Sequence, residues 1–287
     1  MKGFDFLKFY RVKDWIKNLG IVLLGILVAK NLEIDILKGI IAFLLSSFLL
    51  AYAFSLNDYS DWLFGKERNY MSQLKTKKRN KLILIVFPLI ISLFISLIFF
   101  AHEVMIIISF FLFVILYTFY SYPPRWKKNW KFSLFINAFC LGTLLLFIGY
   151  FSQSSNPNWW LFMFSFIYFS YLLSSEVLHQ ISHIRRDKKA NIKSFPIIFG
   201  IKGSVQLIEL IQFIVIVFSI SGMIASQKLF PILLVTTIFS VFRIFRVKRI
   251  KTHKDANYLR NKMGGIYEGI FYLLILLLTF SRVYFSN

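Results

Sequence analysis

Long runs of apolar residues recur along the whole chain, and short polar segments separate them. Most runs approach the roughly 20 residues that an α-helix needs to cross a bilayer. The pattern predicts an all-α integral membrane protein, with about nine transmembrane helices in a single domain over residues 1–287. The expected spans are 17–32, 36–57, 82–102, 104–122, 132–152, 159–182, 204–225, 229–247 and 265–285.

Composition and charge agree with this topology. The chain is 57% hydrophobic and carries a formal charge of +21, which in a soluble protein would suggest a nucleic-acid partner. However, 30 of the 34 Lys and Arg residues fall in the connections on one side of the predicted spans. Such segregation is typical of cytoplasmic loops. We therefore predict a multi-pass protein of the cell membrane, with the N-terminus in the cytoplasm and the C-terminus outside, and no nucleic-acid partner.

The first polar cluster closes the second predicted span. Asn57 and Asp61 are four residues apart and Asp58 and Asp61 three apart, so they share a helix face, and Glu67 follows in the loop. Mg²⁺ is commonly held by one or two carboxylates together with substrate phosphate oxygens. Two acids are equally typical of an ordinary solvated helix end, so this cluster alone leaves both interpretations open.

The second cluster closes the sixth predicted span, after a deeply apolar run. Spacings of four, three and four residues place Glu176, Gln180, His183 and Asp187 within an arc of roughly 60° on a helix, and His179 lies beside this stripe. Solvation does not explain polar side chains at that depth, so we interpret the cluster as functional. A zinc site is an alternative interpretation of this cluster. We disfavour it because the cluster holds two histidines and no cysteine. The residues are Glu176, His179, Gln180, His183 and Asp187.

The two clusters occupy equivalent places, each at the end of an even-numbered span and before a basic loop. This pseudo-repeat of two helical halves predicts a central cavity open to the cytoplasmic side, with carboxylates on opposite walls. Such a cavity suits a metal-bridged diphosphate whose remaining charge is neutralised by Lys and Arg. Further candidates for the cavity, each more often an interfacial residue when taken alone, are Arg11, Lys13, Lys17, Asn18, Tyr117, Tyr120, Ser121, Arg125, Lys127, Lys128, Lys131 and Asn137.

These motifs resemble those of the UbiA superfamily of intramembrane prenyltransferases. The family's first motif, NDxxDxxxD, matches the stretch from Asn57 except that Gly65 replaces its last Asp. Its second motif, DxxxD, matches at Asp187, while His183 replaces the first Asp. The stretch RVKDWIKN at 11–18 resembles the N-terminus of the branch that transfers phosphoribose to polyprenyl phosphate.

The resemblance implies a Mg²⁺-dependent transfer of an isoprenoid from an allylic polyprenyl diphosphate to a small or lipid acceptor within the membrane. It implies Asp58, Asp61 and Asp187 as metal ligands, acting in catalysis with Tyr120 and Lys127. Phosphoribosyl transfer to a polyprenyl phosphate is the first alternative, and a non-catalytic transporter or lipid-binding protein is the second. The expected substrate-binding residues are Asn57, Arg11, Lys17, Asn18, Glu176, His179, Gln180, His183 and Asn137.

Overall fold

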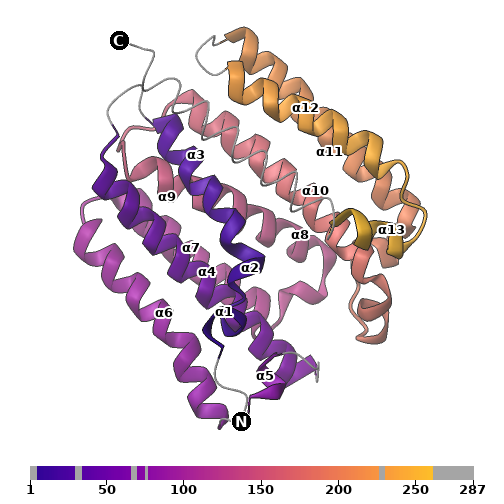
Figure 1. Cartoon of the computed structure of the whole chain (residues 1–287), viewed down its shortest axis with the longest axis horizontal. Coiled ribbons are helices and arrows are strands. Elements are labelled where there is room, and N and C mark those ends of the chain that lie inside the picture. The colour runs from indigo at the N-terminus through magenta and orange to yellow at the C-terminus, as the bar shows by residue number, and fades with distance from the viewer. Residues whose placement is uncertain (1–4, 30–33, 66–69, 75–76, 226–229, 261–287) are drawn as a thin grey trace. The chain divides into compact units, whose positions relative to one another are not determined.

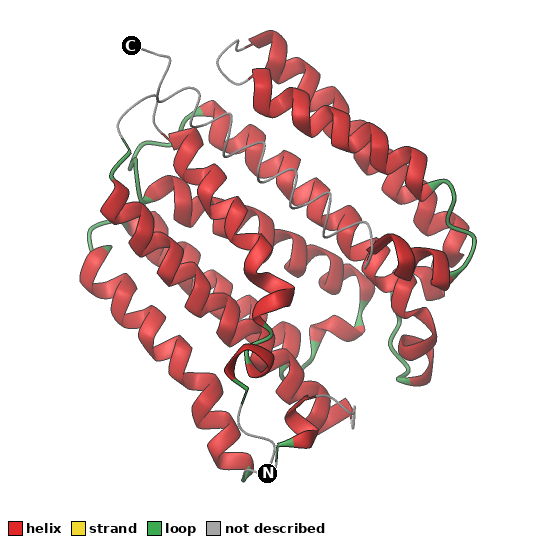
Figure 2. Cartoon of the chain, in the orientation of Figure 1, coloured by secondary structure: helices red, strands yellow, loops and turns green. Residues whose placement is uncertain are grey.

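The structure, a computed structural model, describes residues 5–29, 34–65, 70–74, 77–225 and 230–260. Every regular element in these ranges is helical (Figure 2). The α-helices are α1 (Phe6–Phe9), α2 (Val12–Trp15), α3 (Leu19–Ala29), α4 (Ile36–Gly65), α5 (Tyr70–Gln73), α6 (Lys78–Phe99), α7 (Val104–Ser121), α8 (Trp130–Ala138), α9 (Leu145–Phe151), α10 (Trp159–Lys189), α11 (Phe195–Ala225), α12 (Phe230–Val247) and α13 (His253–Tyr258). Short 3₁₀ turns cover Ile16–Asn18 and Trp126–Lys128, and a π-helical segment, Phe139–Leu144, joins α8 to α9.

Seven helices of the described chain are long and apolar enough to cross a membrane. They coincide with the second to eighth predicted spans and confirm them. The first predicted span is represented by the 11 residues of α3, and the ninth, 265–285, lies outside the described residues, as does Glu67. The total of nine spans and the orientation of the termini stay predictions.

Two helices extend further at their polar ends than hydropathy alone predicts, and a helical segment from Phe195 precedes the bend of α11 at Gly200. α4 runs to Gly65, α10 runs to Lys189, and α11 already begins at Phe195. The long loop expected after the sixth span is therefore reduced to 190–194. Adding a residue to an existing helix is inexpensive compared with nucleating one, so polar residues can prolong a helix beyond its apolar span. Both polar clusters consequently lie on continuous helix.

The chain divides into two compact units, and the first comprises Met1–Trp126 and Leu144–Leu161. In this unit α3 packs against α9 with almost no space between the backbones. A Cβ atom at Gly149 would lie 2.0 Å from the carbonyl oxygen of Val22, and one at Gly25 would lie 2.2 Å from that of Leu146. Small residues permit this close approach, which is a common basis of helix association in membranes.

Helix α4 is the centre of the first unit and contacts α3, α6, α7 and α9 (Figure 1). Leu45, Leu49 and Ala53 of α4 are fully buried. By contrast, α6 leaves Phe94 and Ile98 60% and 68% exposed. Exposed side chains of this size are expected where a helix faces lipid, because lipid tails are as apolar as the side chains themselves.

The second unit comprises Lys127–Thr143 and Phe162–Asn287. Helices α11 and α12 run side by side in it (Figure 1). Helix α11 bends at Gly200, whose φ of +72° and ψ of 172° suit glycine alone. A core cluster joins α8, α10, α11, α12 and α13, and consists of Leu134, Val177, Leu178, Ile181, Phe195, Ile208, Val247, Ile250 and Ala256.

Candidate active site

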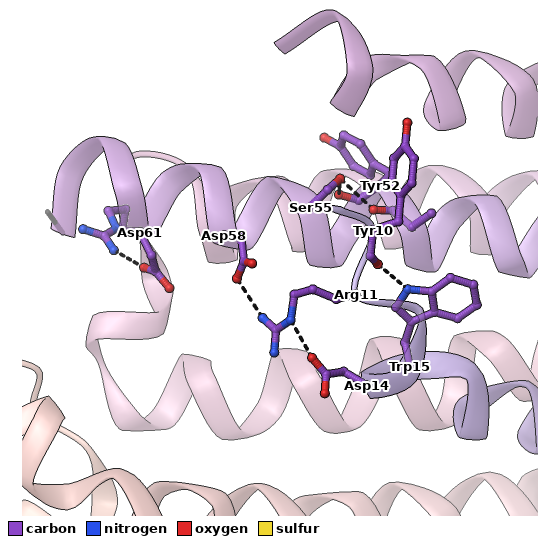
Figure 3. Close-up of polar contacts among 10 residues, drawn as sticks. Tyr10, Arg11, Asp14, Trp15, Tyr52, Ser55, Asp58 and Asp61 are labelled. Atoms are coloured by element: carbon purple, nitrogen blue, oxygen red, sulfur yellow. Dashed lines mark hydrogen bonds and ion pairs between the residues drawn. The ribbon is translucent and has the colours of Figure 1, made fainter. Parts of the chain in front are cut away.

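In the first unit, the segment before α3 brings Arg11 to the polar end of α4. The guanidinium donates from Nη1 to Oδ1 of Asp58 at 2.9 Å and from Nε to Oδ2 of Asp14 at 2.7 Å (Figure 3). Burial by itself would lower the pKa of Arg11, but the carboxylates of Asp58 and Asp14 outweigh burial and raise this pKa above its ordinary value. The guanidinium thus stays charged and fixes the Asp58 carboxylate.

Asp61, one turn further along α4, is held by a second arginine. Arg125 follows α7 and donates from Nη2 to Oδ1 of Asp61 at 2.7 Å. The two side chains are only 8% and 13% exposed. Ser60 on α4 donates to the carbonyl oxygen of Ser121, which ties the end of α7 to α4 directly before the loop that carries Arg125. Because the pair is buried, removing either partner would take a charged hydrogen bond away from a buried charge.

Both of these arginines adopt the left-handed backbone region. The φ angle is +54° at Arg11 and +57° at Arg125. Residues other than glycine rarely adopt this region, and such conformations cluster at functional sites. Local hydrogen bonds hold both turns: the Trp15 Nε1 donates to the carbonyl oxygen of Tyr10 at 2.6 Å (Figure 3), and the Arg125 N–H donates to that of Tyr122 at 2.8 Å. The fold therefore accepts backbone strain at the two points that direct a guanidinium towards α4.

The oxygen donors at the end of α4 fit a magnesium ion that is shared with a phosphate. Asn57, Asp58 and Asp61 lie within five consecutive residues on one helix. Among the described residues there is no group of three or more His, Cys, Asp or Glu side chains that could hold a metal without help. Mg²⁺ does not require one, because it usually binds through one or two carboxylates, substrate phosphates and water.

Charge also favours a cation at this site. The contacts described above bring three carboxyl groups, those of Asp14, Asp58 and Asp61, together with the two guanidinium groups of Arg11 and Arg125. Carboxylates repel a diphosphate, and a divalent cation bound to them reverses the sign of the local charge. The donor set and its charge therefore fit Mg²⁺ and a diphosphate together.

An aromatic stack lies on α7 in the same unit. The ring centroids of Phe113 and Tyr117 are 5.5 Å apart, and those of Tyr117 and Tyr120 are 5.3 Å apart. The Arg11 guanidinium carbon lies 5.4 Å from the ring centroid of Phe54.

Tyr120 is buried, and its predicted catalytic role stays a prediction. The same holds for Lys17, which is exposed, and Asn18, which is buried in the turn before α3.

In the second unit, Gln180 joins three segments. Its Nε2 donates to Oγ of Ser133 on α8 at 3.2 Å, and its Oε1 accepts from the backbone N–H of Phe195 at 2.9 Å. The same Nε2 lies 3.5 Å from Glu176, whose carboxyl group also interacts with the Asn137 side chain. Gln180 thus positions the second polar cluster between α8 and the start of α11, whereas its predicted contact with substrate stays a prediction.

The histidines of the second cluster lie next to each other and meet an arginine. The ring centroids of His179 and His183 are 4.6 Å apart, and Nε2 of His183 lies 2.8 Å from Nη1 of Arg260. A guanidinium can only donate, so this imidazole nitrogen is the acceptor and does not carry a proton in this arrangement. His183 therefore orients Arg260, which also donates to Ser182 at 3.3 Å.

Main-chain hydrogen bonds link the segments that carry Asp187 and Lys127, which belong to the same unit. The Lys193 N–H donates to the carbonyl oxygen of Lys128, and the Trp130 N–H donates to that of Lys193, both at 3.1 Å. This pairing joins the turn that holds Lys127 to the segment that follows Asp187. Asp187 is buried. That Asp187 shares a metal ion and a cavity with Asp58 and Asp61 stays a prediction.

Some residues of these networks were not singled out by the sequence. In the sequence, Asp14 is one residue of a charged N-terminal segment, and Arg260 is one of many cationic residues in loops. Ser133 carries no signal at all. The spacing of Arg11 and Asp14, three residues apart, is the only pattern that could have indicated an ion pair.

Comparisons with known proteins agree with this fold. A family model described as the UbiA prenyltransferase family matches residues 18–276. Digeranylgeranylglyceryl phosphate synthase of Methanocaldococcus jannaschii is 28% identical over 205 residues, covering 69% of this chain and 68% of that protein. The structure of a UbiA homolog from Archaeoglobus fulgidus bound to GPP and Mg²⁺ superimposes with a TM-score of 0.79 at 15% identity, over 97% of this chain and 99% of that one. A structure from work on digeranylgeranylglyceryl phosphate synthase in membranes gives a TM-score of 0.65 at 20% identity, over 97% and 96% of the two chains.

Proposed function

Because the chain belongs to the UbiA prenyltransferase family, we propose that it transfers an isoprenoid group from an allylic polyprenyl diphosphate to an acceptor within the membrane, with Mg²⁺. The observation that carries the proposal is the paired arrangement at the end of α4. Asp58 and Asp61 each face a guanidinium, at 2.9 Å and 2.7 Å. Carboxylates for a cation and guanidinium groups for phosphate oxygens therefore stand together.

The chain's own residues serve to bind and orient the diphosphate. Arg11 and Arg125 hold the two carboxylates in place, and each guanidinium presents several N–H donors in a fork that matches phosphate geometry. Asn57, Asp58 and Asp61 would hold the Mg²⁺, which supplies positive charge to the departing diphosphate. The side chains of Asp58 and Asp61 are only 14% and 13% exposed, and such burial strengthens their electrostatic contacts.

The acceptor that we propose is a lipid bearing a glycerol phosphate. The relative from Methanocaldococcus jannaschii is named for a product of this class. In the transfer, a hydroxyl oxygen of the acceptor forms an ether bond to the allylic carbon, the bond from that carbon to the diphosphate oxygen breaks, and the hydroxyl proton is released. The reaction needs no oxidant or reductant.

The test is to offer purified protein geranylgeranyl diphosphate with a geranylgeranylglyceryl phosphate acceptor and, separately, phosphoribosyl diphosphate with a polyprenyl phosphate. Release of diphosphate from the isoprenoid donor should require Mg²⁺ and should be lost in Asp61→Ala. Asp35→Asn is the matched control, because Asp35 caps the opposite end of α4 and Asn also caps helices. Turnover of the ribosyl donor alone would overturn the proposal in favour of phosphoribosyl transfer.

A further inference from the structure

An arginine outside the site described so far lies inside the second unit. Arg243 belongs to α12 and is half-buried. Its Nη2 donates to Oγ of Ser175 on α10 at 2.8 Å, and its guanidinium carbon lies 4.6 Å from the ring centroid of Tyr171. These two contacts are neutral, and the buried Nε has no hydrogen-bond partner in the described part of the chain. Among these contacts, no anion faces the charge of Arg243.

The position of this arginine does not suit a simple role at the membrane surface. Ser175 precedes the predicted cytoplasmic end of its span, residue 182, by seven residues, or roughly 10 Å of helix. An arginine that only neutralised lipid headgroups would direct its guanidinium to the aqueous boundary. The neighbouring Phe242 and Phe245 of α12 are 57% and 63% exposed, whereas Arg243 is directed towards Ser175 and Tyr171 of α10. Charged side chains that face the protein interior from within a membrane span usually mark a functional site.

We propose that Arg243 and Ser175, beside the ring of Tyr171, form a subsite for the phosphate group of the lipid acceptor. The guanidinium supplies a two-donor fork that matches a phosphate, and the serine hydroxyl supplies a further donor. Ser175 directly precedes Glu176 and lies about 100° around α10 from it. The subsite therefore flanks the polar stripe of α10 and would hold the acceptor by its phosphate. This inference rests on the proposed function and names the acceptor's recognised group.

The phosphate bound at this subsite could belong to the acceptor or to a phospholipid of the bilayer. The two sources differ in the chemistry of the phosphate group. The acceptor carries a phosphate monoester, whereas phosphatidylglycerol carries a diester with a single negative charge. Equilibrium binding to protein in neutral detergent, without donor, should compare an alkylglycerol phosphate, the same alkylglycerol without phosphate, and phosphatidylglycerol. Since no donor is present, the outcome is independent of isoprenoid turnover.

We expect the wild type to bind the alkylglycerol phosphate at least about 10-fold more tightly than the alkylglycerol, in line with a buried charged hydrogen bond. Arg243→Met should abolish this preference, and Arg243→Lys should keep part of it. Arg249→Met is the matched control, because Arg249 follows the same helix and is exposed. Thermal unfolding of each variant identifies any that fails to fold, and the conservative lysine variant then carries the test.

Three results would overturn the subsite. They are equal binding of the phosphorylated and neutral probes by the wild type, an unchanged preference in Arg243→Met, and equally tight binding of phosphatidylglycerol. Equally tight binding of phosphatidylglycerol would show that Arg243 binds a bilayer lipid and not the acceptor. Failure of the donor assay, in contrast, would overturn the proposed function, and a phosphate preference that depends on Arg243 would survive it.

Discussion

Asp58 and Asp61 lie three residues apart on α4, and each is bound by an arginine that is remote in sequence, at separations of 47 and 64 residues. The cluster is therefore assembled from the N-terminal segment, the end of α4 and the loop after α7. Packing of α4 against α7 and the turn around Trp15 bring these three segments together. Its integrity depends on tertiary structure, which makes the ion pairs direct targets for mutation.

Removing one partner of the buried pair should cost more than removing both. Arg125→Met takes the guanidinium away from the buried Asp61 carboxylate, and we expect a loss of about 3 kcal/mol in the free energy of unfolding. The double variant Asp61→Asn with Arg125→Met should regain much of this loss, because neither position of the buried pair then carries a charge. Denaturation in detergent measures both, with the exposed Lys131→Met as the control. Additive effects of the two changes would contradict the pairing.

Gln180 should act by positioning the second polar cluster. Gln180→Ala removes the bonds to Ser133 and to the Phe195 N–H, leaving a buried backbone donor unsatisfied at a cost of about 1–3 kcal/mol. We expect turnover to fall and the Mg²⁺ concentration at half-maximal rate to rise. A purely structural role would lower the amount of folded enzyme without moving that concentration. Gln206→Ala, at an exposed position of α11, should behave as wild type.

The contact between α3 and α9 should not tolerate a single methyl group. Gly149→Ala places a Cβ 2.0 Å from the Val22 carbonyl oxygen, so the two helices must separate. We expect the midpoint of thermal unfolding to fall by several degrees, in line with the cost of overpacking, about 1–3 kcal/mol. Gly39→Ala meets only ordinary contacts, the nearest at 3.6 Å, and should leave the midpoint unchanged or raise it. Equal midpoints for Gly149→Ala and the wild type would refute the close packing.

Hydropathy predicts much of this fold because a membrane span is defined by length and apolar content, both of which are local properties. The seven long helices follow for that reason, and helical spacing likewise places Asp58 and Asp61 on one face. The residues that pair with these two acids cannot be predicted from local sequence in the same way. The sequence marks Arg125 as a loop cation, and its selection by Asp61 depends on a left-handed backbone that only the folded turn imposes. Ser133 and Arg260 show the same limit, since they meet Gln180 and His183 across helices that no local pattern relates.

The central claim is that the cluster at the end of α4 binds an allylic diphosphate together with Mg²⁺. The most direct measurement is the equilibrium binding of an unreactive donor, geranylgeranyl S-thiolodiphosphate, to the protein in detergent with and without Mg²⁺, which requires no acceptor. The account predicts that Mg²⁺ tightens binding by at least about 10-fold in the wild type and in Asp35→Asn, and has little effect in Asp61→Ala, because a metal ligand is lost. Binding that is independent of Mg²⁺, or an Asp61→Ala variant that responds to Mg²⁺ as the wild type does, would contradict it.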